Sequence, residues 1–350
     1  MKKVIFVGWI SKGAVPVVGE TVKNQYIIEE LRKYCEVVEL DFYQKGRHPW
    51  IYIQAFWTFV KYPHAPIIIS TSAKNVYALL RLFKFLGLKR HIIHWVVGGA
   101  FPQLIKEGRF RADVFNYVDF NLVQCKDMIR QLKEAGVNNG KFVQNFKKIS
   151  YYPDFEKNMA LRRQEKKIRF VFLSRVHPAK GCDDIVQAVQ ALNSKGYGDR
   201  FSVDFYGKTD SSYREYFIKS IESIGNITYK GVLNLKEAEG YDVLARYHAM
   251  LFPTFHPSEG FAGVFIDAFI AGLPVLASDW AYNAECIEDG RTGIIFPVHD
   301  VTALAAVMEK CIKKEIDLEA MARNARAEAP KYEAQNAINR DYLEGLGLID

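Results

Sequence analysis

Two acidic residues, eight positions apart, are the first candidates for chemistry in this sequence. Glu259 stands directly before Gly260 and Phe261, and Asp267 follows in an apolar run. If a helix begins near Gly260, eight residues make a little over two turns, so both carboxylates fall on the same side. The N–H groups from Gly260 to Ala262 would then be free donors at a helix N-terminus, which is a site for anions. This pattern suits a ligand with hydroxyls and phosphates, such as a sugar nucleotide. The simpler alternative is a capped helix with a favourable first-turn charge.

Two cations lie near the start of the second half of the chain. Arg175 ends an apolar stretch at 170–174, and Lys180 comes five residues later, directly before Gly181. At the carboxyl end of a buried strand, an arginine fork and a mobile lysine suit a diphosphate. The alternative is a solvated pair of charges in a loop. The segment lacks the G-x-x-x-x-G-K-[ST] pattern of a Walker A loop. No G-x-G-x-x-G follows the first expected strand either, which argues against a dehydrogenase.

The pattern along the chain predicts the scaffold for these residues. Short apolar strands alternate with helices, which is typical of a doubly wound α/β sheet. The expected strands are 2–8, 35–41, 66–70, 91–97, 118–124, 168–174, 201–207, 227–229, 249–253, 274–277 and 294–296. The expected helices are 20–34, 75–90, 126–136, 183–195, 213–224, 302–326 and 332–346, and 11–19 is expected to be a loop. In such sheets ligands bind outside the carboxyl ends of the strands.

A polar stretch at 147–167 divides this pattern into two halves of similar size. It includes the run Arg162-Arg-Gln-Glu-Lys-Lys167, after which the apolar alternation restarts, so we interpret it as a linker. A length of 350 residues also suggests two domains. Two α/β halves would leave a ligand-binding cleft between them.

Composition indicates a globular protein of a reducing compartment, and we expect it in the cytoplasm. Hydrophobic residues make up 49% of the chain and charged residues 25%. Five scattered cysteines without a CxxC pair indicate neither a disulfide framework nor a metal site. The basic and apolar start at 1–10 is short and lacks a cleavage site, so we expect a strand there rather than a signal peptide. No apolar stretch reaches the ~18 residues of a membrane span.

The net charge of +7 is unevenly distributed. Through residue 160, 24 Lys and Arg stand against 13 Asp and Glu, a balance of +11, and the remainder has 23 against 27, or −4. The segment 75–90 has the pattern of a basic amphipathic helix able to lie on an anionic membrane. Its alternative is a crossover helix with a solvated basic edge. Further positive charge in this half comes from Lys106, Arg109, Arg111, Lys147 and Lys148. Nucleic acid is a less suitable partner because no recognition motif accompanies the charge.

The second half resembles the retaining glycosyltransferases of family four, of the glycosyltransferase group 1 type. The segments that carry the resemblance are Ser174-Arg175, Lys180-Gly181, Asp204-Phe-Tyr-Gly207, Pro253-Thr254, Glu259-Gly-Phe261, Asp267 and Gly272-Leu-Pro-Val-Leu-Ala277. The resemblance implies a GT-B fold, with two Rossmann-like domains facing across a cleft. It implies an acceptor-binding domain at 1–150, to which 332–350 cross back as the last helix. The donor-binding domain would span 151–331.

The resemblance also implies roles for matching positions in the donor domain. Arg175 and Lys180 would hold the diphosphate of the donor and stabilise the leaving group. Glu259 would contact hydroxyls of the donor sugar, and these three residues would carry catalysis. Gly260 and Phe261 would present backbone N–H groups to the sugar and phosphate.

Other matches are less specific or depart from the family pattern. Asp267 stands where the family has a glutamate that binds the ribose hydroxyls, so the reach of this carboxylate is shorter. Gly207 and Val232 resemble segments that line the base pocket. Gly19 resembles the loop glycine that lets the backbone of the first domain approach a phosphate, although Glu20 follows where a second glycine is common.

On the acceptor side the family often has a histidine at a strand end. Here His94 lies inside an apolar strand, where a histidine is more often a core residue. Gly98 and Gly99 form the tip. We therefore place the two glycines near the acceptor and keep His94 as a second candidate.

The expected function is a retaining hexosyltransferase that uses a nucleotide sugar, with UDP-sugar before GDP-sugar. The acceptor would be a glycan or a lipid-linked acceptor in surface polysaccharide or glycoconjugate synthesis. No cofactor and no metal are expected, because the sequence has no DxD motif and the cations would take the metal's place. We expect a cytoplasmic enzyme that can lie peripherally on a membrane. Two alternatives remain: a hydrolase or epimerase of the same fold, and an inactive nucleotide-binding scaffold.

Overall fold

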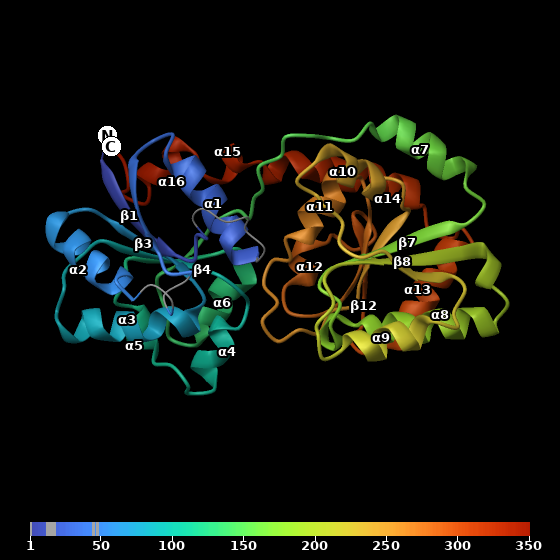
Figure 1. The fold of residues 1–350 in the computed structure, drawn as a ribbon, viewed down its shortest axis with the longest axis horizontal. Coiled ribbons are helices and arrows are strands. Elements are labelled where there is room, and N and C mark those ends of the chain that lie inside the picture. Colours follow the sequence, from blue (N-terminus) through green and yellow to red (C-terminus); the bar gives the residue numbers. More distant parts are fainter. Residues whose placement is uncertain (1, 12–18, 44–45, 47–48) are drawn as a thin grey trace. The chain divides into compact units, whose positions relative to one another are not determined.

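The computed structural model describes residues 2–11, 19–43, 46 and 49–350 of the chain. Most of the loop expected at 11–19 therefore lies outside the described residues. The chain divides into two compact units. The first consists of Met1–Lys148 with Tyr332–Asp350, and the second is Ile149–Lys331 (Figure 1).

The first unit is built on a six-stranded parallel sheet with the order β2-β1-β3-β4-β5-β6. Its strands are β1 (Lys3–Gly8), β2 (Glu36–Asp41), β3 (Ile67–Thr71), β4 (Ile92–Val96), β5 (Phe120–Val123) and β6 (Gly140–Phe142). Its helices are α1 (Gly19–Leu31), α2 (Ile51–Lys61), α3 (Ala73–Phe85), α4 (Phe101–Lys106), α5 (Ala112–Phe115), α6 (Lys126–Glu134), α15 (Ala334–Ala337) and α16 (Arg340–Glu344). Helices α1, α15 and α16 cover one face, and α2, α3 and α5 lie on the other.

The second unit repeats this architecture with the strand order β12-β11-β10-β7-β8-β9. Its strands are β7 (Ile168–Leu173), β8 (Phe201–Tyr206), β9 (Ile227–Tyr229), β10 (Ala249–Phe252), β11 (Val275–Ser278) and β12 (Gly293–Phe296). Its main helices are α7 (Phe155–Gln164), α8 (Cys182–Ser194), α9 (Arg214–Ile221), α10 (Ala238–Leu244), α11 (Val264–Ile270), α12 (Asn283–Cys286), α13 (Val301–Ile312) and α14 (Leu318–Glu328). Helices α8, α9 and α13 lie on one face of its sheet, and α10, α11 and α14 on the other.

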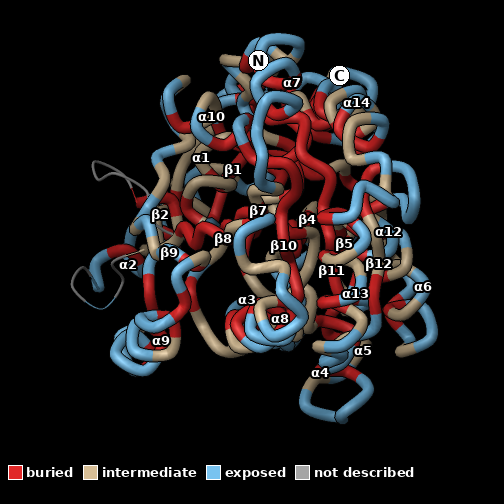
Figure 2. The backbone as a smooth tube through the Cα atoms, turned by 90° about the vertical axis from the view of Figure 1, so that its right-hand side faces the viewer, coloured by how far each residue is buried: buried red, intermediate tan, exposed pale blue. Residues whose placement is uncertain are grey.

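Both sheets confirm the α/β class that the sequence predicted, in the form of two Rossmann-like units. The central strands are mostly apolar runs, which is typical of strands buried on both faces. In β3, β4 and β10 every residue is buried, and Figure 2 shows this for the labelled strands β4 and β10. None of the helices in the described part of the chain is long and apolar enough to cross a bilayer.

Several expected elements were wrong in extent. The helix expected at 302–326 is two helices, because Lys314 has a positive φ of 61° and Asp317 caps α14 by accepting from Ala320 N–H. The helix expected at 332–346 is also interrupted: α15 ends at Ala337, and Asn339 caps α16. The helix expected at 75–90 ends at Phe85, and Gly87 then adopts a left-handed φ of 60°.

The stretch interpreted as a polar linker contains α7, which is part of the second unit. Arg162, in the middle of its charged run, is buried, and its guanidinium donates to the carbonyl oxygens of Ala245, Ala271 and Gly272. These carbonyls follow the last turns of α10 and α11, where backbone acceptors lack helical partners. Burial lowers the pKa of Arg162 to about 10, so it keeps its charge at neutral pH.

The same corner holds a buried histidine that must stay neutral. The backbone N–H of Arg169 donates to Nδ1 of His248 at 3.1 Å, and Nε2 lies 3.2 Å from the carbonyl oxygen of Arg162. Burial lowers the pKa of His248 to about 4, and the charge of Arg162 acts in the same direction. A proton on Nδ1 would remove the acceptor for the N–H of Arg169, so acid should weaken the contact between β7 and His248, the residue directly before β10.

We expect acidification to destabilise the protein through His248. The folded pKa of about 4 is below the ordinary value of 6.5, so the unfolded chain binds the extra proton first. Stability should be complete above pH 6.5 and fall by roughly 3 kcal/mol as the pH approaches 4. Urea unfolding at a series of pH values measures this loss. His248→Asn keeps an acceptor but does not titrate, so its loss should be smaller. The exposed control His64→Asn should follow the wild type, and equal losses in all three proteins would contradict the assignment.

Candidate active site

The candidate residues of the second unit lie where its strand order reverses. After β7 the chain builds β8 and β9 on one side, and it then crosses to β10 on the other side of β7. In a doubly wound sheet, this switch point at the carboxyl ends is where ligands bind. Arg175 comes two residues after β7, and Thr254 comes two residues after β10. The two segments that leave the switch point therefore carry the candidate side chains.

The loop between β7 and α8 is held tightly against the end of β10. Gly181 has a φ of 73°, and a Cβ there would stand 2.1 Å from the carbonyl oxygen of Pro253. Only glycine permits both this conformation and this approach. The backbone N–H of Phe255 donates to the carbonyl oxygen of Ala179 at 2.9 Å. These contacts fix the position of Lys180, which is the residue between Ala179 and Gly181.

Lys180 and Glu259 meet at this position in a buried ion pair. The ammonium of Lys180 donates to Oε2 of Glu259, and the two side chains are only 11% and 10% exposed. The hydroxyl of Thr254 donates to the same carboxylate oxygen at 2.8 Å. The structure therefore brings together a cation and an acid that are 79 residues apart in the sequence. Thr254 was missed as a site residue, although its place directly after a buried strand at the switch point was a usable signal.

A compact turn presents Glu259, and the helix expected there is absent. Helix α11 begins only at Val264, so the 3.6-residue periodicity that placed Glu259 and Asp267 on one helical side does not apply. Gly260, Phe261 and Ala262 lie in the loop before the helix and not in its first turn. The expectation of a helix N-terminus near Gly260 is wrong, because the helix begins four residues later.

His256 shapes the turn that carries Glu259. Its carbonyl oxygen accepts from the backbone N–H of Glu259 at 3.0 Å and from the indole N–H of Trp280 at 2.9 Å. Its ring Nδ1 accepts from the backbone N–H of Ser258 at 3.2 Å. Burial, followed by the charge of Lys180, lowers the pKa of His256, which favours the neutral ring that this bond needs. His256 therefore positions the loop.

Asp267 lies within α11 and is almost fully buried, with 2% of its surface exposed. The hydroxyl of Tyr241, from α10, donates to its Oδ1 at 2.7 Å. A ribose hydroxyl that bonds this carboxylate has to share it with Tyr241 or displace the tyrosine. The shorter acid at this position is thus accompanied by a tyrosine hydroxyl that occupies one of its oxygens.

Arg175 differs from Lys180 in its surroundings. Its side chain is exposed, and within the described part of the chain it has no hydrogen bond or ion pair.

Gly207 lies close to the backbone beside Arg175. It has a φ of 145°, and a Cβ there would stand 1.7 Å from the carbonyl oxygen of Ser174. Its N–H donates to the carbonyl oxygen of Gly231 at 2.8 Å, and the next residue, Val232, is 71% exposed. Val232 is therefore an exposed apolar side chain on this edge, and the charge of Arg175 acts on Asp210 and His256 without a direct ion pair.

Some candidate residues of the first unit lie at the ends of its strands and helices, whereas His94 lies inside a strand. Gly98 and Gly99 follow the carboxyl end of β4, and Gly19 is the exposed first residue of α1. His94 is fully buried inside β4, with Nδ1 2.9 Å from Oδ1 of Asn121 and Nε2 3.1 Å from the carbonyl oxygen of Thr71. Burial lowers its pKa. Both ring nitrogens have protein partners, so His94 has the contacts of a core residue.

A family model described as glycosyl transferases group 1 matches residues 154–328, which is half of the chain. The chain belongs to this family. The matched segment falls within the second unit of this group 1 glycosyltransferase, which carries Arg175, Lys180 and Glu259.

Individual relatives and solved structures match between 44% and 99% of the chain. A Klebsiella pneumoniae protein described as an uncharacterized 41.2 kDa protein in the cps region is 22% identical over 69% of this chain and 67% of its own length. The Staphylococcus aureus capsular polysaccharide biosynthesis glycosyltransferase CapM is 26% identical over 44% of this chain and 39% of its own length. Thus the match spans about two fifths of CapM. The crystal structure of Anabaena HepE in complex with UDP has a TM-score of 0.71 at 16% identity, covering 99% and 100% of the two chains. This likeness shows the shared GT-B fold.

Proposed function

We propose that this group 1 glycosyltransferase transfers a hexose from a nucleotide sugar to a hydroxyl of a glycan or lipid-linked acceptor, with retention of anomeric configuration. The observation that carries the proposal is the group at the β7/β10 switch point. A buried lysine–glutamate pair and a threonine hydroxyl lie there, and the same loop carries Arg175, which is exposed and makes no hydrogen bond or ion pair in the described part of the chain. Cations for a diphosphate and an acid for sugar hydroxyls are what a nucleotide-sugar site requires.

The proposed chemistry breaks the bond between C1 of the sugar and the phosphate oxygen of the donor. The electron pair leaves with the nucleoside diphosphate, and Arg175 and Lys180 stabilise the growing negative charge without a bound metal. A new bond forms between C1 and the acceptor oxygen on the face that the phosphate leaves. The proton of the acceptor hydroxyl passes to an oxygen of the departing phosphate. Charge and atoms balance without a protein nucleophile.

In this proposal Glu259 orients the sugar. Its Oε2 already accepts from Lys180 and Thr254, so Oε1 is the oxygen that faces a sugar hydroxyl. Lys180 has three donors, and it can keep Glu259 while contacting a phosphate. Gly260 and Phe261 add backbone N–H groups from the turn, and Asp267 binds the ribose in place of the usual glutamate. The first unit binds the acceptor at Gly98 and Gly99.

The preferred donor in this proposal is a UDP-sugar, with a GDP-sugar as the second choice. Anabaena HepE, which is similar to this chain over its full length, has been solved with UDP and with UDP-glucose, and this supports the preference. A role in surface polysaccharide synthesis is supported by the name of CapM. We propose a cytoplasmic location because all five cysteines are described and none forms a disulfide.

A thermal-shift screen against UDP, GDP, ADP and their hexoses tests the donor class. We expect the largest increase in Tm with UDP or a UDP-hexose, because a ligand stabilises only the folded protein that binds it. Transfer is then measured with the preferred donor in the presence of EDTA, and NMR of the product gives its anomeric configuration. No shift with any nucleotide would overturn the donor site. An inverted product would overturn the retaining mechanism but not transferase activity.

A further inference from the structure

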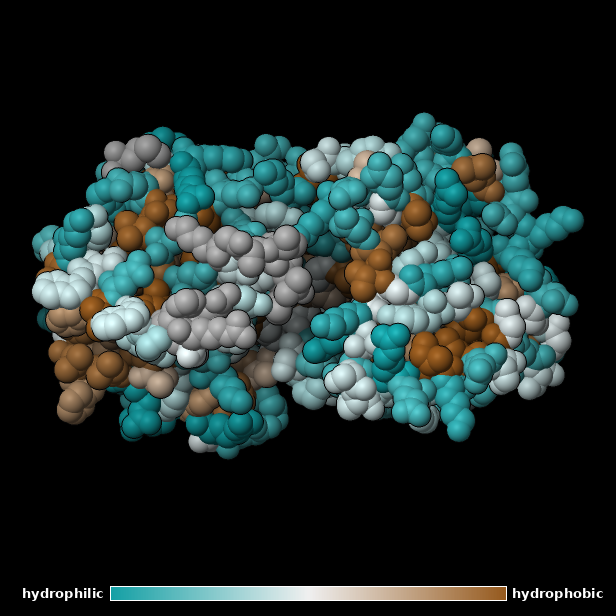
Figure 3. Space-filling model, viewed as in Figure 1, coloured by the Kyte–Doolittle hydropathy of each residue, from teal (hydrophilic) through white to brown (hydrophobic). Residues whose placement is uncertain are grey.

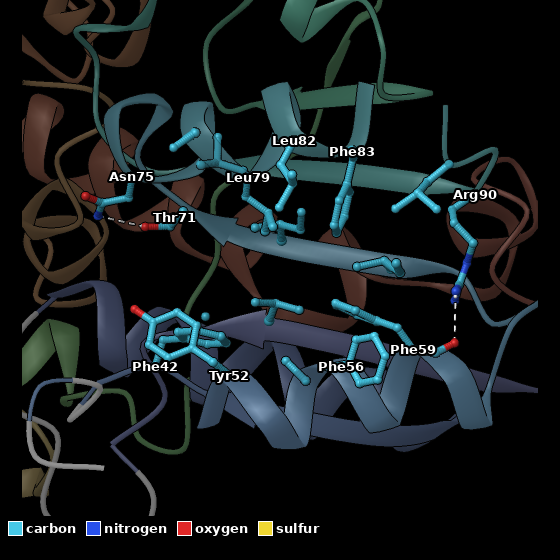
Figure 4. Close-up of a pocket in the computed structure, with 18 of the residues that line it drawn as sticks. Phe42, Tyr52, Phe56, Phe59, Thr71, Asn75, Leu79, Leu82, Phe83 and Arg90 are labelled. Atoms are coloured by element: carbon cyan, nitrogen blue, oxygen red, sulfur yellow. Dashed lines mark hydrogen bonds between the residues drawn. The ribbon is translucent and has the colours of Figure 1, made fainter. Parts of the chain in front are cut away.

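The first unit contains an apolar cavity that the donor site does not explain. It has a volume of about 740 Å³ and lies between α2 and α3, against β1 and β3. In Figure 4, Leu79, Leu82 and Phe83 of α3 point into it from one side, and Phe56 and Phe59 of α2 from the other. Protein interiors are close-packed, with few voids larger than a water molecule. A hollow of this size falls in the range of ligand pockets.

The cavity is apolar along its length and polar at its ends. The residues of α3 and its C-cap that line it recur on one helix face from Asn75 to Leu86, which corresponds to roughly 16 Å at the rise of an α-helix. This length is about one half of the ~30 Å hydrocarbon core of a bilayer, and thus about the length of one lipid chain. A long, narrow apolar space fits a hydrocarbon chain better than it fits a glycan, whose hydroxyls would find few partners there.

One end of the cavity opens at the switch point of the first sheet. The strand order reverses between β1 and β3, and the cavity is lined by Gly8 at the end of β1 and by Thr71 at the end of β3. The side-chain amide of Asn75 donates to the Thr71 hydroxyl at 3.0 Å (Figure 4). Ligands of doubly wound sheets bind at this position. A chain in the cavity would therefore place its polar end where a reacting group is expected.

The carboxylate of Glu20 lies near this polar end of the cavity. Glu20, in the first turn of α1, lies next to Thr71, and its Oε1 is buried without a hydrogen-bond partner among the described residues. Buried polar atoms are almost always bonded, so an unpaired oxygen in this place calls for a donor. A hydroxyl of the bound molecule would supply one. Glu20 does not line the cavity itself, so its oxygen would meet a ligand hydroxyl just beyond the polar end at Thr71.

The rim of the cavity is suited to a membrane. Helix α2 is apolar on nearly all sides, yet only Ile51 and Ala55 are buried. Phe56 and Trp57 are 61% and 62% exposed, and Figure 3 shows hydrophobic side chains gathered over α2 and α3. Exposed apolar patches mark sites for proteins, ligands or membranes.

The charge at the rim favours an anionic bilayer over the other occupants. Lys61 ends α2, and Lys89 follows α3; both are exposed, and in the described part of the chain neither has an ion pair. Aromatic side chains flanked by lysines are typical of segments that lie in a lipid interface. A polar glycan acceptor alone would leave both the aromatic rim and the cavity without a use.

We propose that the cavity between α2 and α3 holds the hydrocarbon chain of a lipid-linked acceptor, which enters from an anionic membrane and places its polar end beside Thr71 and Glu20. That the bound lipid is an acceptor rests on the proposed transferase function. The binding of a hydrocarbon chain in the cavity does not depend on that function. The proposal chooses the lipid-linked acceptor over the free glycan. It also gives the aromatic face of α2 its role as the membrane contact.

Two alkyl phosphates that differ only in chain length test the proposal. Calorimetric affinities are measured for dodecyl phosphate, kept below its micelle concentration, and for butyl phosphate. We expect the dodecyl compound to bind at least about 100-fold more tightly, because each further buried methylene adds to affinity. Ala78→Trp should reduce this ratio at least tenfold, since Ala78 lines the cavity but is exposed enough to accept a larger side chain without unfolding. Ala160→Trp, on an exposed site of α7, is the matched control and should keep the wild-type ratio.

Equal affinities for the two phosphates would overturn the proposal, and so would a ratio that Ala78→Trp leaves unchanged. A dimer in solution that Ala78→Trp dissociates would assign the cavity to a second copy of the chain instead. UDP affinity, measured on the same three proteins, separates this proposal from the function. If the protein binds UDP and transfers sugar but binds both alkyl phosphates equally well, only the cavity proposal is contradicted. If its affinity rises with alkyl chain length but it binds no nucleotide, only the proposed transferase function is contradicted.

Discussion

Glu259→Gln is expected to lower kcat for sugar transfer by roughly 100- to 1,000-fold, the usual effect of removing one electrostatic contact from a transition state. The amide has the same shape, and it can still accept from the Thr254 hydroxyl that bonds the carboxylate at 2.8 Å. What it lacks is the negative charge that strengthens a bond to a sugar hydroxyl as the glycosidic bond to the phosphate breaks. Initial rates at saturating donor and acceptor measure the effect.

The same variant should bind UDP with nearly unchanged affinity, because in the proposal Glu259 contacts the sugar and not the diphosphate. Glu222→Gln, at the exposed C-cap of α9, removes an equal charge at the end of the helix that points away from the carboxyl edge of the sheet, and it should transfer sugar at the wild-type rate. Normal turnover by Glu259→Gln would remove the residue from the mechanism. Loss of UDP affinity together with kcat would show that Glu259 acts on the diphosphate through Lys180.

The fold was largely predictable because parallel sheets give a strong sequence signal. Strands buried on both faces are unbroken apolar runs, and the expected strand 227–229 matches β9 without a shift. Breaks between helices were harder to predict. Lys314 separates α13 from α14 by adopting a positive φ, and lysine has no preference for that conformation. Charge was misleading at Arg162, which looks solvated in a run of basic and acidic residues. It is buried because three carbonyl groups from distant segments need a donor.

The candidate site was predictable in its residue types but not in its contacts. The motif indicated Lys180 and Glu259 separately, for the phosphate and for the sugar, whereas the structure pairs them directly. That pairing depends on how closely the loop at Gly181 approaches Pro253, which no local pattern encodes. Tyr241 is likewise hidden in the sequence, because it reaches Asp267 from another helix. The cavity was not foreseen at all, since α2 resembles a core segment and only packing shows which of its faces remains open.

Lys180→Met is expected to lower the affinity for UDP about 100-fold, since a charge-assisted hydrogen bond contributes roughly 1.5–3 kcal/mol. Methionine keeps the length of the apolar stem but removes the ammonium. Arg175→Met should cost less, about tenfold, because the exposed guanidinium of Arg175 gains less from a contact that water screens. Isothermal titration with UDP measures both. Unchanged affinity in Lys180→Met would contradict the diphosphate clamp.

The ion pair adds a second effect that has to be separated from binding. Lys180→Met leaves the carboxylate of Glu259 buried without its cation, at 10% exposure, and should cost roughly 3 kcal/mol of stability. In the double variant Lys180→Met, Glu259→Gln the uncompensated charge is gone, so most of that stability should return. The affinity for UDP should not return, because the ammonium that contacts the phosphate is still missing. If the double variant regained both, the loss of binding in Lys180→Met would be a consequence of a disturbed loop, and Lys180 would be a structural partner of Glu259 rather than a ligand of the donor.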